Sequence, residues 1–250
     1  MRIQYISDLH LDNSENLKFF ESNKIVAEAD ILFLAGDVIP LKDIRLIDCF
    51  LDALSENFDE VYWLPGNHEL YGLDYSNYRL NYLENIRDNI FLINNKSIVI
   101  EGVEFVFSTL WSHISSATRW YNQVYINDFK FIQFEGKPID FYDYNSFHEE
   151  CRQFLTARLS DYSSQKKVVI THHCPILLPR EVLSVDKPLI ESYCNDLGEL
   201  IRKGYPDVWI YGHTHANIGP VHIGATSCIT NQFVSTKDVF NNIATFIVDF

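Results

Sequence analysis

The feature that most constrains the fold is a repeated design in which an apolar segment ends in a residue type that binds metals. Residues 31–35 form an unbroken apolar run that leads to Gly36 and Asp37. A run of this length that ends in glycine is typical of a strand buried on both faces. Asp37 is therefore predicted at the carboxyl end of a strand, where open α/β sheets place their ligands. A carboxylate at this position is costly to desolvate unless another group pairs with it.

Four further segments repeat this design. They are residues 3–7, which lead to Asp8 and His10; residues 61–65, which lead to Asn67 and His68; residues 168–171, which lead to His172 and His173; and residues 208–211, which lead to His213 and His215. A single occurrence has an ordinary explanation, because turns at strand ends favour Asp, Asn and Gly for backbone reasons. Five occurrences in one chain favour a functional site.

The side chains at these strand ends form a set of oxygen and nitrogen donors. They comprise two carboxylates, one amide and several imidazoles, a set that suits Mn, Fe, Zn or Co better than a soft metal. In the spacings Asp8-x-His10 and His213-x-His215, both side chains leave the strand end on one side. One carboxylate can bridge two cations, which two-metal sites hold ~3.5–4 Å apart. We therefore expect two divalent or trivalent metal ions, which would bind phosphoryl oxygens and convert a bound water into hydroxide near neutral pH.

Composition places the chain among ordinary globular proteins. Apolar residues make up 47% of the 250 residues and charged residues 22%. No internal repeat or linker divides the chain, so one domain over residues 1–250 is expected. No apolar run approaches the ~20 residues of a membrane helix, and the chain starts directly with a strand, so neither membrane insertion nor a signal peptide is expected. Five scattered cysteines without a C-x-x-C motif predict reduced thiols and a cytoplasmic location.

The net charge disfavours nucleic acid as a partner. The formal charge is −14 and the isoelectric point about 4.9. Such a surface repels phosphate backbones at long range, although a local basic patch can survive a negative total. A small phosphorylated or phosphodiester substrate is the partner implied by the family resemblance of the strand-end motifs.

Apolar periodicity predicts the helices. Residues 43–57, 74–88 and 146–160 have apolar side chains at helical spacing, and residues 196–203 form a short helix. Residues 11–29 are polar and are expected to form a loop with at most one helical turn. Residues 174–188 contain three prolines and are also expected to form a loop.

Short β segments occupy the middle and the end of the chain. Residues 91–107 form a meander with turns at 94–95 and 101–102, which suggests a second sheet stacked on the first. Residues 221–230 and 243–248 are predicted to be β as well. Residues 110–144 are rich in aromatic side chains without clear periodicity, and we interpret them as an irregular insertion that overhangs the site.

The five motifs resemble those of the calcineurin-like metallophosphoesterase superfamily. They are D-L-H at 8–10, G-D at 36–37, G-N-H-E at 66–69, T-H-H at 171–173 and G-H-T-H at 212–215, and they stand in the family order over nearly the whole chain. The segments 109–112 and 127–129 and the Trp209 block look like a group of small bacterial phosphohydrolases within it. The chain departs from the protein Ser/Thr phosphatases, because Val38 follows Asp37 where those enzymes have an Asp-Arg-Gly run and Pro65 precedes Gly66 where they have Arg.

The resemblance implies a fold, a ligand set and an acid. The fold is an α/β (α+β) four-layer αββα sandwich of two mixed β-sheets flanked by helices. The ligands of the first metal are Asp8, His10, Asp37 and His215, and those of the second are Asp37, Asn67, His172 and His213. Asp37 is thus the bridge. His68 matches the family histidine that meets the substrate and protonates the leaving group.

The resemblance also implies the reaction. It is hydrolysis of a phosphomonoester or phosphodiester by a metal-activated water or hydroxide, with His68 as the acid. A nuclease or cyclic-nucleotide phosphodiesterase is the alternative within this class. A catalytically inactive scaffold with the same fold is the alternative of another class.

Other residues near the motifs have weaker claims. His173 is interpreted as a neighbour of the ligand His172, and Cys174 as an ordinary thiol. His113 and Asn217 are candidates for contact with substrate, and His148 is expected on a helix surface. His222 is expected to be structural. Glu69 either orients a ligand histidine or caps the turn.

Overall fold

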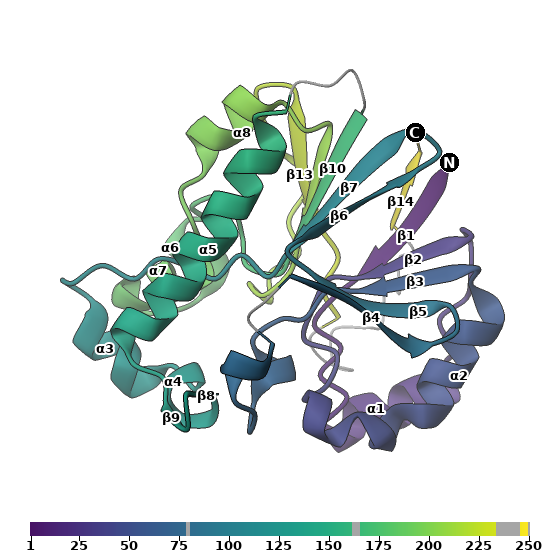
Figure 1. Ribbon diagram of the computed structural model, residues 1–250, viewed down its shortest axis with the longest axis horizontal. Helices are drawn as coiled ribbons and strands as arrows, with labels where there is room; N and C mark the ends of the chain where they lie inside the picture. Colours follow the sequence, from purple (N-terminus) through teal and green to yellow (C-terminus); the bar gives the residue numbers. More distant parts are fainter. Residues whose placement is uncertain (79–80, 162–165, 234–245, 250) are drawn as a thin grey trace.

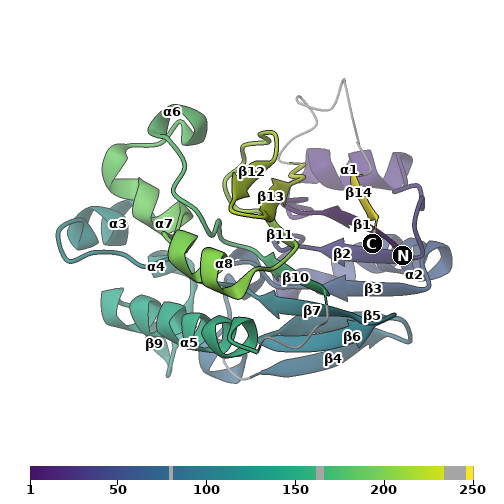
Figure 2. The same cartoon turned by 90° about the horizontal axis from the view of Figure 1, so that it is seen from above.

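The computed structural model describes residues 1–78, 81–161, 166–233 and 246–249. In these residues two six-stranded sheets pack face to face and helices cover both outer faces (Figures 1 and 2). The predicted four-layer arrangement of two mixed sheets is therefore confirmed. No helix in the described ranges is long and apolar enough to cross a membrane.

The first sheet has the order β14-β1-β2-β3-β5-β4. Its strands are β1 (Arg2–Ile6), β2 (Ile31–Leu34), β3 (Glu60–Trp63), β4 (Tyr82–Arg87), β5 (Ile90–Asn94) and β14 (Phe246–Asp249). The central strands β1, β2, β3 and β5 run parallel, and the two edge strands run antiparallel to their neighbours. The carboxyl ends of β1, β2 and β3 therefore meet at one edge of the sheet.

The second sheet repeats this plan with the order β12-β13-β11-β10-β7-β6. Its strands are β6 (Lys96–Ile100), β7 (Val103–Ser108), β10 (Lys166–Thr171), β11 (Val208–Tyr211), β12 (Val221–Ile223) and β13 (Thr226–Thr230). Strands β7, β10, β11 and β13 are parallel, with antiparallel edges on either side.

Successive side chains of a strand point to opposite faces of its sheet, so apolar residues fill three layers: one between the sheets and one under the helices on each outer face. Phe33 points between the sheets and meets Phe105 and Phe107 at ring distances of 5.1 and 5.2 Å, whereas its neighbours Leu32 and Leu34 face the helices. The first outer layer is covered by α1 (Ser14–Ser22) and α2 (Asp48–Asn57), which follows the 3-10 helix η1 (Leu41–Ile47). The second is covered by α5 (Phe141–Leu159) and α8 (Gly198–Gly204).

Shorter elements complete the chain between the layers. They are the 3-10 helices η2 (His68–Leu70), η3 (Tyr75–Asn77) and η4 (Lys187–Leu189), the helices α3 (Arg119–Tyr125), α4 (Asp128–Phe131), α6 (Arg180–Leu183) and α7 (Ile190–Tyr193), and the strands β8 (Gln133–Phe134) and β9 (Lys137–Pro138).

Two predicted helices agree with the structure apart from their ends. Residues 43–57 correspond to η1 followed by α2, with Leu51 and Leu54 buried as predicted. Residues 146–159 belong to α5, which begins five residues before the predicted start. The reason is a capping box, in which Asp140 accepts from the backbone of Asp143 while the Asp143 side chain accepts from the backbone of Asp140.

Two predictions for segments were wrong, and a third was correct only in part. Residues 74–88 are not a helix: of those that the structure describes, 75–77 form the short η3 and 82–87 form strand β4, because the tyrosine-rich spacing also suits a strand and pairing with β5 decides between the two. Residues 11–29 contain the nine-residue helix α1, capped by Asn13, whose polar outer face hid its periodicity. The supposed loop at 174–188 contains the helical turn α6 and the start of η4.

The predictions for the β segments were partly correct. The turn at 101–102 joins β6 and β7 into a hairpin as predicted. At 94–95, however, the chain crosses from the first sheet to the second, so that residues 91–107 are not one meander. The predicted strand at 221–230 is the pair β12–β13. Of residues 243–248, those from 246 onward lie in β14, and 243–245 lie outside the described residues.

Candidate metal centre

The ends of three parallel strands place the first group of polar side chains. Asp8, Asp37 and Asn67 lie shortly beyond β1, β2 and β3. Backbone hydrogen bonds continue past the strands, because Asp8 N donates to Gly36 O at 2.9 Å and His10 N donates to Asp37 O at 3.0 Å. The loops that carry these residues are therefore held in register with each other.

The second sheet supplies the remaining histidines. His172 follows β10, and His213 and His215 follow β11. The backbone N–H of His213 lies 3.1 Å from both carboxylate oxygens of Asp8, a contact that joins the corresponding ends of the two sheets. The five motifs, spread over residues 8–215, thus converge on one point.

The converging donor atoms form two groups that share Asp37. In the first group, one donor atom from each of four residues lies within 4.8 Å of the others: Asp8, His10, Asp37 and His215. The Nε2 atoms of His10 and His215 are 3.0 Å apart, and His215 Nε2 is 3.4 Å from Asp8 Oδ1. In the second group the same holds for Asp37, His172 and His213.

Asn67 lies beside the second group. Its Oδ1 is 3.2 Å from His172 Nε2, which is itself 3.3 Å from Asp37 Oδ1. His172 Nδ1 is held by the carbonyl of Ala35 at 2.9 Å, which turns Nε2 toward the centre. Together with Asn67, the two groups contain the residues that the resemblance assigns to the two metals. Their role as ligands remains a prediction.

The backbone at this point is unusual. Five of the candidate ligands have positive φ angles: Asp8 (57°), His10 (44°), Asp37 (56°), His213 (68°) and His215 (51°). Left-handed backbone is uncommon for residues with a side chain, and strained positions of this kind cluster at functional sites. The strained chain path is what sends these side chains toward one another.

Gly212 has a specific reason to be glycine. A Cβ atom there would lie 2.6 Å from Ser7 Oγ and 2.7 Å from Asp8 Oδ2. Any side chain would therefore push Asp8 out of its place between the sheets.

The potential at the centre favours positive charge. Burial lowers the pKa of His172, but the nearby Asp37 carboxylate outweighs this and raises it to about 10. Burial also lowers the pKa of His215, but its hydrogen bond with Asp8 outweighs this effect and leaves the pKa raised. The pKa of Asp37 is well below its usual range because His172 and His68 outweigh the cost of burial. His213 behaves oppositely: burial and the charge of His173 hold its pKa well below the usual range.

These residues fit a pair of metal ions. Asp8 and Asp37 are 0% and 1% exposed, and buried carboxylates are stable only when they are paired or bind a cation. The donors are carboxylate, amide and imidazole, the set that suits Mn, Fe, Zn or Co. Metal binding needs neutral imidazoles, so an ion would take over the positive charge that protons otherwise supply.

His68 lies at the edge of this centre. Its Nε2 is 4.0 Å from Asp37 Oδ2, its ring is 4.6 Å from that of His10, and a quarter of its side chain is exposed. Its Nδ1 is buried without a hydrogen-bond partner among the described residues. It is absent from both donor groups above, although it forms a further cluster with His10 and Asp12.

A cavity of about 300 Å³ opens over the donor groups. Its lining comprises Asp37, Asn67, His68, Tyr71, Tyr125, Ile126, Asn127, Asp128, Ser192, Tyr193, His213 and His215. Residues 125–128 belong to the segment 110–144, so the expectation that this segment overhangs the site agrees with the cavity. The segment is less irregular than expected, because it contains α3, α4 and the β8–β9 pair.

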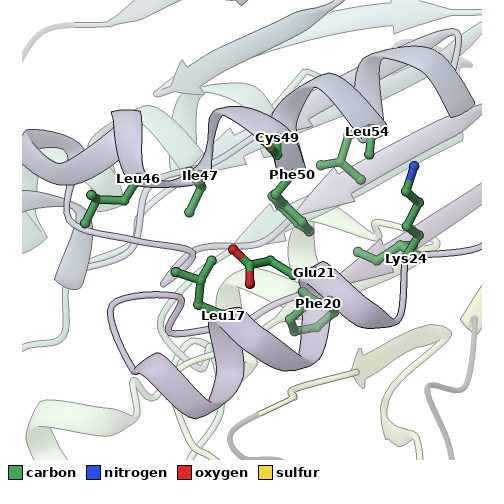
Figure 3. Close-up of a pocket in the computed structure, with 11 residues that line it drawn as sticks. Leu17, Phe20, Glu21, Lys24, Leu46, Ile47, Cys49, Phe50 and Leu54 are labelled. Carbon is green, nitrogen blue, oxygen red and sulfur yellow. The ribbon is translucent and has the colours of Figure 1, made fainter.

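A larger, separate cavity has a different character. It has a volume of about 350 Å³ and lies between α1 and α2, where Phe20 faces Phe50 at a ring distance of 5.8 Å (Figure 3). Apart from Glu21, Lys24 and Cys49, its lining is apolar, and it shares no residue with the cavity over the donor groups.

The residues with weaker claims are engaged elsewhere. His148 is buried, not on the surface, because its face of α5 packs on the sheet and its Nδ1 contacts Trp111 O at 2.5 Å. His113 is exposed, and its ring meets that of His148 edge-on at 5.6 Å. The amide of Asn217 is engaged with the backbone of Gln232 in both directions. Cys174 Sγ donates to Ile176 O.

His173 is a buried neighbour of the centre. Its ring lies 4.0 Å from that of His213, and its Nδ1 is 3.3 Å from Thr109 O. Burial and the charge of His172 lower its pKa to about 3. It belongs to neither donor group.

Glu69 caps the turns that present the ligands and has no hydrogen bond to a histidine among the residues that the structure describes. It is fully buried and accepts from Asp37 N, Val38 N, Gly66 N and Trp63 Nε1 at 2.7–2.9 Å. Burial and the Asp37 charge raise its pKa to about 7. Of the two roles that the sequence left open, the structure favours the capping role.

Glu69→Ala should destabilise the fold. Four buried donors would lose their acceptor, and each unsatisfied buried group costs about 1–3 kcal/mol, so the free energy of unfolding should fall by roughly 3 kcal/mol or more. Denaturant unfolding of the variant and of wild type measures this. Glu69→Gln keeps one acceptor oxygen and should lose less. Equal stability of Glu69→Ala and wild type would contradict the capping role.

Sequence reasoning missed three residues around the ligands. Gln232 accepts from the backbone N–H of His215 at 2.6 Å, and the carbonyl of Ser192 lies 3.1 Å from His213 Nε2. Asp128 accepts from Asn67. All three come from segments without a motif, and only Asp128 had a signal, as part of the segment 127–129.

Comparisons with known proteins agree with this architecture. The chain is 27% identical to the uncharacterized protein L509 of Acanthamoeba polyphaga mimivirus over 281 residues, which cover 100% of this chain and 98% of that protein. It is 36% identical to the acyl-carrier-protein phosphodiesterase PptH of Mycobacterium tuberculosis over 91 residues, 34% of this chain and 28% of that one. The crystal structure of PptH has a TM-score of 0.71 with this fold at 18% identity, covering 98% of this chain and 94% of that chain.

The family itself is shown by a match over most of the sequence. The family model described as calcineurin-like phosphoesterase matches residues 1–217, a range that contains all five motifs. This chain therefore belongs to the calcineurin-like phosphoesterase family.

Proposed function

We propose that this protein is a metal-dependent phosphodiesterase that acts on a small organic phosphodiester. The observation that carries the proposal is the pair of donor groups sharing Asp37 at the base of one cavity. Such a pair suits two cations that hold both the attacking and the leaving oxygen of a phosphoryl displacement.

The residues that would hold the ions are those of the two groups. Asp8, His10, Asp37 and His215 would hold the first ion, and Asp37, Asn67, His172 and His213 the second, with Mn, Fe, Zn or Co as the candidates. When bound, the ions supply Lewis acidity and a nucleophile at neutral pH. His68, which lines the cavity, would donate a proton to the leaving oxygen.

The cavity wall favours a diester over a monoester. None of the described residues that line it is Lys or Arg. A monoester carries close to two negative charges at neutral pH, whereas a diester carries one, and cationic side chains commonly recognise the former. Three tyrosines, Tyr71, Tyr125 and Tyr193, instead offer apolar ring faces to the organic part of a substrate. The phosphodiesterase activity in the name of the relative PptH supports the same choice.

The competing functions differ in what they would cleave or bind. A nuclease or cyclic-nucleotide phosphodiesterase remains the alternative within the class, and the charge of −14 weighs against the nuclease. An inactive scaffold is the alternative outside it, and such a scaffold has no need for two complete donor groups.

A substrate panel with added Mn²⁺ tests the proposal. We expect turnover of a bis-ester such as bis-p-nitrophenyl phosphate to exceed that of p-nitrophenyl phosphate by at least about tenfold in kcat/KM, because the described wall offers no cationic side chain for the second charge of the monoester. Cyclic nucleotides and single-stranded DNA complete the panel and test the alternatives. A preference for the monoester would refute the diester assignment. Absence of turnover together with absence of bound metal would favour the scaffold.

A further inference from the structure

The candidate ligand Asn67 has a buried carboxylate as its partner. Asp128 Oδ1 accepts from Asn67 Nδ2 at 2.7 Å and from the hydroxyl of Tyr71 at 2.8 Å. Asp128 is 2% exposed and Asn67 3%. Burying a carboxylate without a cationic partner is costly, and an apolar side chain would fill the same space at lower cost. This placement therefore calls for a role beyond packing.

The segment that carries Asp128 is fastened to the loop that carries Asn67. Asp128 is the first residue of α4, and Gly72 N donates to Phe131 O at 2.7 Å, at the other end of this helix. Gln133 N donates to Leu73 O at 2.9 Å. The carboxylate is thus held against the amide by two backbone hydrogen bonds between the segments.

The chemistry of the pair determines which way the amide faces. The oxygen and nitrogen ends of an Asn side chain are nearly equal in size, but one only accepts and the other only donates. A carboxylate only accepts, so it must face Nδ2. Oδ1 then points to the opposite side, where it lies 3.2 Å from His172 Nε2 in the second donor group.

We propose that Asp128 is a positioning residue that presents the oxygen of Asn67, and not its nitrogen, to the second metal. This inference rests on the proposed two-metal function and extends it to a residue outside the family motifs. An amide nitrogen cannot bind a cation, so an amide free to rotate would occupy the second site less well. Outer partners of metal ligands typically change metal affinity about 10–100-fold when they are removed.

Exchange of the two side chains tests the proposal at pH 8. Mn²⁺ affinity and stoichiometry are measured by calorimetry and by metal analysis for wild type, Asp128→Asn, Asn67→Asp and the double variant. Asp128→Asn should weaken the second Mn²⁺ roughly tenfold, because the amide introduced there can also donate and so permits the reversed orientation of Asn67. Asn67→Asp should weaken it too, because two carboxylates would then face each other.

The direction in which Asp128→Asn changes Mn²⁺ binding in the Asn67→Asp background distinguishes a positioning role from a packing role. In the Asn67→Asp background, Asp128→Asn supplies a donor to the new carboxylate and should restore the second Mn²⁺ to within about threefold of wild type. If Asp128 only fills space, Asp128→Asn should weaken binding of the second Mn²⁺ or leave it unchanged, both in wild type and in Asn67→Asp. Either of these results in the Asn67→Asp background would overturn the proposal. Tyr71→Phe is the control for the hydroxyl that contacts both side chains, at 2.8 Å from Asp128 Oδ1 and 3.3 Å from Asn67 Nδ2. It leaves the bond between Asn67 and Asp128 in place, so it should still bind two Mn²⁺.

The test remains decisive even if the Asp128→Asn variant does not fold. Thermal unfolding identifies folded variants, and if Asp128→Asn is unfolded, Asn67→Asp alone is sufficient. A carboxylate ordinarily binds Mn²⁺ better than an amide, so weaker binding in Asn67→Asp supports the facing carboxylate, and tighter binding overturns it. Wild type that binds one Mn²⁺ overturns both proposals. Wild type that binds two but cleaves no ester overturns the proposed function alone.

Discussion

Replacing Asp37 with Asn should abolish hydrolysis and lower the occupancy of both metal ions. Asp37 belongs to both donor groups, with Oδ1 at 3.3 Å from His172 Nε2 and Oδ2 at 3.9 Å from His10 Nε2. A neutral amide bridges two cations poorly, and metal ions contribute several kcal/mol to phosphoryl transfer, so kcat/KM should fall by about 10³-fold or more. Metal analysis of the purified variant, alongside kinetics on the bis-ester, measures both effects.

Asp30 provides the matched control. It immediately precedes β2, whereas Asp37 follows the same strand at its other end, and Asp30 is exposed. Asp30→Asn makes the same chemical change outside the centre and should keep two ions and wild-type kinetics. Two full equivalents of metal and near wild-type activity in Asp37→Asn would end the bridging role.

The convergence of the motifs was predictable from sequence because it follows from strand direction. Asp8, Asp37 and Asn67 each follow an apolar run, and the carboxyl ends of parallel neighbours share an edge. The pairing of this edge with the ends of β10 and β11 was available only from the family resemblance. No local pattern indicates that His213 N meets the carboxylate of Asp8, 205 residues away.

Predictions failed where tertiary packing, and not local pattern, decided the outcome. The tyrosine spacing in 74–88 fits a helix and a strand alike, and only the neighbouring β5 selects the strand. His148 looks like a polar residue on a helix surface, but it is buried and Trp111 O lies against it. In both cases the deciding contact comes from a residue or strand outside the segment itself, so the local pattern does not reveal it.

The segment 110–144 shows the same limit at the site. Its sequence suggests a wall over the cavity, which by itself predicts that deletion of residues 115–140 spares metal binding. The structure revises that expectation, because the deleted part contains Asp128, whose carboxylate holds the candidate ligand Asn67. The segment is both a wall and a support of the second donor group.

Replacing His68 with Asn should slow hydrolysis according to the leaving group. His68 follows the candidate ligand Asn67, yet it lies in neither of the two donor groups that share Asp37 and instead lines the cavity. General acid catalysis contributes typically ~10²–10⁴-fold, and an alkoxide leaving group needs the proton far more than p-nitrophenolate does. The variant should therefore lose about 10²-fold or more in kcat on alkyl esters and clearly less on p-nitrophenyl esters, while it keeps both metals.

The leaving-group comparison separates an acid from a brace. If His68 only supports the turn after β3 or the ring of Tyr71, 4.3 Å away, its removal disturbs the centre for every substrate alike. An equal loss on both ester types, or loss of metal, would therefore end the acid assignment. His113→Asn makes the same change at an exposed histidine outside the cavity and should leave both rates unaltered. Because each variant is compared with itself on two leaving groups, differences in protein concentration cancel, and the ratio of the two rates reports proton donation alone.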